Sequence, residues 1–323
     1  MNNPRMYLID DLTTTELAGC RDGFGEGLVN LGKTNSKVVV LCGDLTESTR
    51  SQAFAETYPG RFFEAGVAEQ NMMGVAAGLA LNGKIPFVNS YAVFSPGRNW
   101  DQLRVSICYS NLNVKIVGAH AGISVGPDGA THQALEDLAI TRVLPNLIVV
   151  APADKAQTFK ATLAIAEHPG PAYIRFGRNQ TPAFTTHMTP FKLGEAQLLR
   201  EGRDLTIFAC GPLVYQALSA AVELETETDI EVINVHTLKP LDRKTIIKSA
   251  QKTKRVLTVE EHQISGGLGG AIAELLSETA PTLMKRIGMA DCFGESGQPE
   301  ELLAKYGMDK QAIVGAVRDL IKA

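Results

Sequence analysis

Short, uninterrupted apolar runs alternate with segments of helical periodicity along most of the chain, and this alternation constrains the fold more than any other feature. Residues 38–42 read Val-Val-Val-Leu-Cys and are followed at once by Gly43-Asp44. Apolar runs of this length are typical of strands that are buried on both faces. Further strands are predicted at 86–90, 114–118, 147–151 and 172–176, and helices near 69–81, 97–110, 132–142 and 153–167. Strands and helices that alternate in this way form right-handed crossovers in a mostly parallel sheet.

The first helix is predicted to open at Thr13. Its side chain can cap the helix while Glu16 reaches back three residues later, which is the pattern of a capping box. The apolar residues that follow fall on one helical face. They are Leu17, Cys20, Phe24, Leu28 and Leu31.

The alternation stops between residues 178 and 195, where the chain is rich in Thr and Pro and has no period. We interpret this stretch as a linker. A second alternation follows, with strands predicted at 205–209, 230–235, 255–260 and 284–289 and helices from 211, over 265–276 and near 309–322. The sequence therefore predicts an α/β fold of two domains, residues 1–180 and residues 192–323, each a mostly parallel sheet flanked by helices.

Composition argues against several classes of protein. The net charge is −4 and the 31 Lys and Arg residues are scattered, so we expect no nucleic-acid partner. No apolar run approaches the roughly 18 residues needed to cross a bilayer, and the N-terminus has no signal-peptide core, so we expect no membrane association. The five cysteines form no CxxC pair, which indicates reduced thiols in a cytoplasm rather than a zinc or iron–sulfur site.

Glu69 is the first candidate site residue. It follows a predicted strand at the start of a predicted helix, and ligands of parallel sheets bind at the carboxyl ends of the strands. Taken alone, an acid at this place needs no function beyond complementing a helix N-terminus.

A long loop at 118–133 is the second candidate. It carries four glycines, His120, His132 and Asp128 between a predicted strand and a predicted helix. Glycine lets backbone approach a ligand closely, and histidine is suited to proton transfer near neutral pH. A lone histidine is usually structural, but two histidines and an acid in one long loop favour a functional site.

Aromatic and basic residues follow two other strand ends. Tyr91 and Phe94 can form a stacking wall for a planar ring, whereas Trp100 is expected in the core. Arg178 follows the last strand of the first domain, where a guanidinium either binds a phosphate or is simply solvated. These residues by themselves indicate an α/β enzyme with a polar, histidine-bearing site for a phosphorylated substrate.

Together these segments resemble the transketolase family, over essentially the whole chain, in its pyrimidine-binding and C-terminal domains. The resemblance rests on the order and spacing of five segments. They are Gly-Asp-Leu-Thr-Glu-Ser at 43–48, Ala-Glu-Gln-Asn at 68–71, residues 94–104, Gly-Pro-Asp-Gly-Ala-Thr-His-Gln at 126–133 and Arg-Asn-Gln at 178–180.

The resemblance implies thiamine diphosphate as the cofactor. Glu69 would protonate N1′ of the aminopyrimidine and drive the ring to its imino form, in a nearly dry pocket that favours a protonated carboxylic acid. Phe94, with Tyr91 nearby, would stack on the pyrimidine. Asp44 and Arg98 would be further cofactor-binding residues.

The resemblance also implies a sugar-phosphate substrate and the transfer of a two-carbon ketol unit, as in the pentose phosphate pathway. His120 and His132 would hold substrate hydroxyls and relay protons, with Glu69 as the third catalytic residue. Asp128 would bind the hydroxyl next to the donor carbonyl. The substrate phosphate would be held by Arg21, Ser48 and Arg178.

The chain departs from the family in length. Full transketolases carry a preceding domain with a Gly-Asp-Gly motif and downstream asparagines that bind Mg²⁺ and the diphosphate, whereas here Gly43-Asp44 is followed by Leu45. We expect this chain to hold no metal itself. The start of the chain near the family's domain boundary implies a gene split, with an N-terminal subunit as partner, an α2β2 heterotetramer, and a cofactor that lies across the interface.

Four alternative assignments account for parts of this pattern. The β subunit of a 2-oxoacid dehydrogenase has the same two domains, but its loop lacks Asp-Gly-x-Thr-His. A 1-deoxyxylulose-5-phosphate synthase has that motif but is normally one long chain, and residues 135–138 resemble transketolase more. A non-catalytic relic is disfavoured because Glu69 and both histidines are present. A dinucleotide loop at 265–270 is disfavoured because its glycine spacing does not fit.

Overall fold

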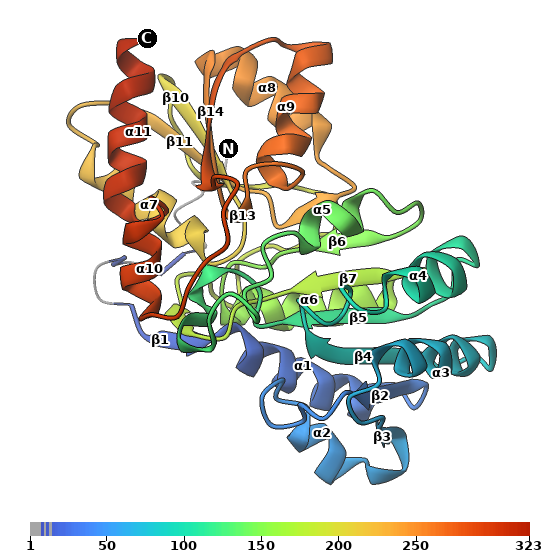
Figure 1. The fold of residues 1–323 in the computed structure, drawn as a ribbon. Coiled ribbons are helices and arrows are strands. Elements are labelled where there is room, and N and C mark those ends of the chain that lie inside the picture. The colour runs from blue at the N-terminus through green and yellow to red at the C-terminus, as the bar shows by residue number, and fades with distance from the viewer. Residues whose placement is uncertain (1–7, 10, 13–14) are drawn as a thin grey trace.

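The computed structural model describes residues 8, 9, 11, 12 and 15–323 (Figure 1). It contains a seven-stranded sheet in the order β12-β6-β7-β5-β4-β2-β3 and a five-stranded sheet in the order β14-β13-β10-β11-β9. A third, two-stranded sheet pairs β1 with β8. The α/β fold with two mostly parallel sheets is confirmed.

The larger sheet has parallel strands that place their carboxyl ends on one edge. They are β2 (Val38–Cys42), β3 (Phe62–Glu64), β4 (Ile85–Tyr91), β5 (Lys115–Ala119), β6 (Ile148–Val150) and β7 (Ala172–Arg175). Five of these were predicted with their ranges, whereas β3, the strand before Glu69, was given no range because its three residues carry no apolar run of their own. Antiparallel β12 (Thr237–Lys239) comes from the second half of the chain and pairs with β6.

Helices cover both faces of this sheet because alternate residues of each strand are apolar on both sides. Val38 and Val40 of β2 pack in the cluster of α1 (Cys20–Thr34) and α6 (Lys155–Glu167). Val39 packs in the cluster formed on the opposite face. That face is covered by α3 (Glu69–Leu81), α4 (Trp100–Gln102), η3 (Leu103–Tyr109) and α5 (Asp137–Arg142). Short helices α2 (Gln52–Thr57), η2 (Pro59–Arg61) and η4 (Ile123–Asp128) lie in the connections.

The smaller sheet is built in the same way. Its strands are β9 (Gln197–Arg200), β10 (Leu205–Ala209), β11 (Ile230–Asn234), β13 (Arg255–Gln263) and β14 (Leu283–Met289). One face packs on α7 (Leu213–Glu223) and α11 (Lys310–Lys322), and the other on α8 (Arg243–Thr253) and α9 (Leu268–Thr279). Helix α10 (Pro299–Lys305) follows β14 (Figure 1). It lies close to η4.

The two sheets share one apolar core. Leu138 and Val149 of the first half belong to the same buried cluster as Phe208 and Ile233 of the second half. Because the two halves pack together in this way, the carboxyl end of β13 lies against the loop that follows β5.

Three predicted local features are corrected. The first helix begins at Cys20, because residues 17–19 form β1 (Leu17–Gly19) against β8 (Gln180–Pro182), and Leu17 is exposed. Thr13, the predicted cap, lies outside the described residues. The stretch interpreted as a linker holds β8, so part of it is ordered in a sheet. The helix predicted at 132–142 starts only at Asp137.

No helix within residues 15–323 combines the length and apolar character that a membrane crossing requires. Over the same part of the chain, no group of three His, Cys, Asp or Glu side chains has a geometry that could hold a metal ion.

Candidate active site

Four rings gather at the carboxyl ends of β4 and β5. Tyr91 ends β4 and pairs in register with Ala119, so His120 follows directly beside it. The Tyr91 and His120 rings are stacked with centroids 4.0 Å apart. Phe94 lies 6.0 Å from Tyr91, and the His132 ring meets Phe94 edge-on at 5.4 Å. The two histidines from opposite ends of the long loop are thus brought to one aromatic cluster.

His120 is a buried, neutral imidazole. It is 1% exposed, and its φ of 56° places it in the left-handed region, which is uncommon for a side-chain-bearing residue. Burial, together with the positive charges of Arg21 and Arg178, lowers the pKa of His120 to about 3. Its Nδ1 has no hydrogen-bond partner among the described residues. Buried polar atoms are normally paired, so this nitrogen is suited to a ligand hydroxyl.

Three guanidinium groups act on this imidazole, those of Arg21, Arg178 and Arg50. Arg21 donates to the Ser48 carbonyl oxygen over 3.3 Å, so Ser48 meets Arg21 through its backbone. Arg50 was missed by the sequence analysis, because nothing local marks a loop arginine as part of a distant cluster. Its Nε pairs with Asp22 at 2.7 Å. The cluster gives this edge of the sheet a positive field for an anionic substrate group.

Arg178 binds the long loop itself. Its Nη1 donates to the Val125 carbonyl oxygen over 3.0 Å and lies 3.5 Å from Asp128 Oδ1. The predicted phosphate ligand and the predicted hydroxyl ligand are therefore neighbours.

Glu69, Arg98 and Phe94 form a second group. Glu69 is the first residue of α3 and is 4% exposed. Arg98 Nη1 donates to Glu69 Oε1 over 3.0 Å, and the Arg98 guanidinium carbon lies 4.1 Å from the centre of the Phe94 ring. Asn99 Nδ2 donates to the Glu69 carbonyl oxygen over 3.2 Å, which fixes the start of the helix. Arg98 thus contacts two of the other predicted cofactor ligands, Glu69 and Phe94.

Asp44 is held by a different acid, Glu64. It follows β2 with a φ of 61°, and its N–H donates to Glu64 Oε1 over 2.7 Å. Glu64 also accepts from the N–H of Gly66 over 2.9 Å. Within the described part of the chain, Asp44 forms no hydrogen bond or ion pair with Glu69 or Arg98. The role of Glu64 in holding this turn was not predicted, because an acid at a strand end has no distinctive local pattern.

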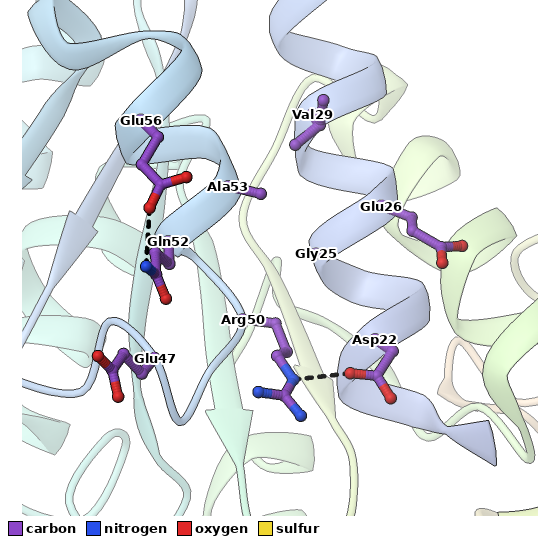
Figure 2. Close-up of a pocket in the computed structure, with 9 residues that line it drawn as sticks. All are labelled: Asp22, Gly25, Glu26, Val29, Glu47, Arg50, Gln52, Ala53 and Glu56. Carbon is purple, nitrogen blue, oxygen red and sulfur yellow. Dashed lines mark hydrogen bonds and ion pairs between the residues drawn. The ribbon is translucent and has the colours of Figure 1, made fainter.

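A cavity of about 660 Å³ lies between α1 and the segment 47–56 (Figure 2). It adjoins Arg21 and Ser48 in sequence, but neither lines it. Four of its lining residues are acids and one is Arg50, which reaches across to Asp22 (Figure 2). The acids are Asp22, Glu26, Glu47 and Glu56. An acidic lining repels a phosphate, so we do not place the substrate phosphate in this cavity.

Comparisons with known proteins agree with this arrangement. Residues 18–183 match the family described as "Transketolase, pyrimidine binding domain", and residues 194–313 match "Transketolase, C-terminal domain". A 6-deoxy-6-sulfo-D-fructose transketolase subunit of Clostridium sp. is 42% identical, over 93% of this chain and 94% of that one. An apulose-4-phosphate transketolase subunit of Phocaeicola vulgatus is 37% identical, over 95% of this chain and 98% of that one.

A solved structure titled "Split gene transketolase, inactive beta4 tetramer" is 47% identical in sequence. It superimposes with a TM-score of 0.88, covering 94% of this chain and 98% of that chain. Fold and site define an α/β enzyme with a buried acid beside stacked aromatic rings. The chain belongs to the transketolase family and corresponds to its pyrimidine-binding and C-terminal domains.

The match to the pyrimidine-binding domain implies thiamine diphosphate as the cofactor. The residues fit this group. The Glu69 carboxyl and the Phe94 ring already bind a planar N–H donor between them, the Arg98 guanidinium. An aminopyrimidine is likewise a flat ring with nitrogen atoms along its edge, so the same acid and the same ring suit it.

Proposed function

We propose that this chain is one subunit of a two-chain transketolase, which transfers a two-carbon ketol unit from a ketose phosphate to an aldose phosphate. The proposal rests above all on one observation, the contact of buried Glu69 and the Phe94 ring through Arg98, beside a cluster of histidines and arginines. The first group suits a pyrimidine, and the second suits an anionic sugar.

The companion would be an N-terminal transketolase subunit that carries the diphosphate and Mg²⁺ site, in an α2β2 heterotetramer. The names of the two relatives support this part, since each is called a subunit and each aligns with this chain over nearly its full length. We also propose domains of residues 1–180 and 192–323, supported by the matched ranges 18–183 and 194–313. A cytoplasmic location is supported by the five free cysteines.

When bound, thiamine diphosphate supplies a stabilised carbon nucleophile. Glu69 holds a proton at N1′ of the pyrimidine, and Phe94 and Tyr91 pack against the ring and keep water from it. Arg98 covers the exposed side of Glu69. Asp44 lies at the end of β2, where we propose that it contacts the same cofactor.

The histidines and arginines bind the sugar in this proposal. His120 is neutral at physiological pH, so its ring offers one donor and one acceptor to substrate hydroxyls. His132 shares the cluster and relays protons, and Asp128 accepts a hydrogen bond from the hydroxyl next to the donor carbonyl. Arg21, Ser48 and Arg178 hold the phosphate. The two relatives are named for a sulfonated and a phosphorylated sugar, both of which carry an anionic group at one end.

Reconstitution tests the proposal. The purified chain is mixed with a companion chain that contains Gly-Asp-Gly and downstream asparagines, and ketol transfer from a ketose phosphate is measured with thiamine diphosphate and Mg²⁺. We expect transfer only from the mixture, and weak cofactor binding to this chain alone. Tight, Mg²⁺-dependent binding to this chain alone in calorimetry would contradict the shared site.

A further inference from the structure

The second half of the chain holds the loop that carries the proposed sugar ligands. Glu261 lies on β13, and its Oε1 accepts a hydrogen bond from the backbone N–H of Ser124 over 2.5 Å. Ser124 belongs to η4, in the middle of the loop at 118–133. Both residues are buried, and Glu261 is only 3% exposed. Donor and acceptor are both withdrawn from water, so loss of the acceptor would leave a buried N–H unpaired.

Gly122 makes room for this carboxylate. Its φ is 93°, and a Cβ at this position would lie 2.4 Å from Glu261 Oε1. Any larger residue would collide with the carboxylate and would also be strained in the left-handed region. The loop is therefore shaped to receive a side chain from the other half of the molecule.

Two further contacts hold the far end of the loop. Gln133 Nε2 donates to the Glu295 carbonyl oxygen over 2.9 Å and to the Ile123 carbonyl oxygen over 3.1 Å. The N–H of Gln263, also on β13, donates to the Leu135 carbonyl oxygen over 2.8 Å. The loop is thus fixed at its middle and at its end by the second half of the chain.

A short chain of contacts connects Glu261 to the sugar ligands. The residue after Ser124 is Val125, whose carbonyl oxygen accepts from Arg178 over 3.0 Å. Arg178 in turn lies 3.5 Å from Asp128. Displacing Ser124 would therefore move the anchor of Arg178, and Asp128 with it.

Arg175 balances the buried acid. Its Nη2 donates to the Glu261 carbonyl oxygen over 3.1 Å, and its Nε lies 2.9 Å from Asp137 Oδ2. Arg175 therefore fixes the backbone of β13 at Glu261, the point from which the side chain extends to Ser124.

We propose that Glu261 is a positioning residue for sugar binding, which acts from the C-terminal half by fixing the Ser124 turn and thereby aligning Arg178 and Asp128. This rests on the proposed function, because it assigns the sugar to those ligands. Among the described residues Glu261 forms no hydrogen bond or ion pair with Glu69 or Arg98, so proton transfer at the pyrimidine should depend little on it.

The test compares variants in the complex with the companion chain. Glu261→Ala removes the acceptor, and we expect the KM for the sugar phosphate to rise roughly ten- to a hundredfold, the scale of one buried N–H left without a partner. C2–H exchange of bound thiamine diphosphate should stay within about twofold, since exchange depends on the Glu69 group. Glu261→Gln keeps an oxygen acceptor at the same distance from the backbone, so its KM should lie close to the wild-type value.

Glu260 provides the matched control. It is the adjacent residue and equally buried, but its oxygens accept from the N–H groups of Leu268 and Gly269 at the start of α9. Glu260→Ala should lower the melting temperature without raising KM. Should Glu261→Ala fail to fold, Gly122→Ala displaces the carboxylate from the opposite side and should give the same rise in KM with normal C2–H exchange.

Two results would overturn the positioning role. One is a wild-type KM in a folded Glu261→Ala or Gly122→Ala complex. The other is an equal KM rise in Glu260→Ala, which would show general damage to the C-terminal half. Failure of the proposed function is a separate result, because the wild-type complex itself would then show no ketol transfer.

Discussion

Arg98 Nη1 lies 3.0 Å from Glu69 Oε1, and the two side chains differ sharply in exposure, 50% for Arg98 and 5% for Glu69. The acid is buried, whereas its cationic partner lies half in solvent. A proton donor to a pyrimidine needs to be shielded from water, and here the guanidinium provides the shield on the open side. The open side of the catalytic acid in the proposed mechanism is thus covered by a side chain that lies half in solvent.

Glu69→Gln tests that acid. Glutamine keeps the size and most of the hydrogen bonding but transfers no proton, so C2–H exchange of the cofactor in D₂O, followed by NMR of the complex, should slow by at least about a hundredfold. Cofactor affinity should change little. Glu56→Gln, an exposed acid on α2, serves as control and should exchange at the wild-type rate. Wild-type exchange in Glu69→Gln would remove Glu69 from the mechanism.

Arg178→Ala tests phosphate recognition. The KM for phosphorylated donors should rise roughly ten- to a hundredfold, because a charge-assisted contact to a phosphate is worth about 1.5–3 kcal/mol. The KM for an unphosphorylated ketose should rise less, because that substrate is affected only through Asp128, which Arg178 no longer holds in place. Arg203→Ala removes an arginine that is 89% exposed at Asp229 and should leave both KM values unchanged. Equal losses for both kinds of substrate would show that Arg178 is purely structural.

His120 makes the fold acid-sensitive. Its pKa in the folded chain is about 3, below the ordinary value of 6.5, so between these values the unfolded chain takes up a proton that the folded chain does not. The free energy of unfolding should therefore fall as the pH falls below 6.5, by up to about 1.4 kcal/mol per pH unit from this group. Urea titrations at pH 6 and pH 5 should show a smaller fall in His120→Asn. The exposed His187→Asn is the control, and an unchanged slope in His120→Asn would contradict the assignment.

Close packing of α1 on α6 gives a prediction on stability. A Cβ on Gly23 would lie 2.1 Å from the Lys155 carbonyl oxygen, which is backbone and cannot move aside alone. Gly23→Ala should thus destabilise the chain by about 1–3 kcal/mol through overpacking. Gly315→Ala, at an exposed place on α11 with open space around its Cβ, should stabilise it by roughly 0.5–1 kcal/mol. Thermal unfolding of both variants measures this, and equal effects of the same sign would refute it.

Parts of this fold are visible in the sequence because local pattern decides them. Residues 38–42 are apolar without a break, and an apolar run of this length is typical of a strand that is buried on both faces. Strand β12 could not be found in this way, since three residues with a lysine at the end carry no period, and they pair with a strand from the other half of the chain. The first helix was placed too early because pairing with β8 overrides the helical spacing of Leu17.

The site shows the same division. His120, His132 and Asp128 were predictable because one glycine-rich loop carries them all. Glu261 was not, because its partner Ser124 lies 137 residues away and nothing near Glu261 marks it as a ligand of a loop. Long-range pairing depends on how the two sheets pack, which composition and spacing do not encode locally.

The short strand β12 has a practical consequence. It closes the β6 edge of the larger sheet, although it belongs in sequence to the second half. A fragment that ends in the stretch 178–195 would therefore expose unpaired N–H and C=O groups on β6, a surface that attracts strands of other molecules. In chimeras that exchange the two halves between relatives, the incoming strand at 237–239 has to pair with β6 of the other parent, so the residues of this pair should be matched.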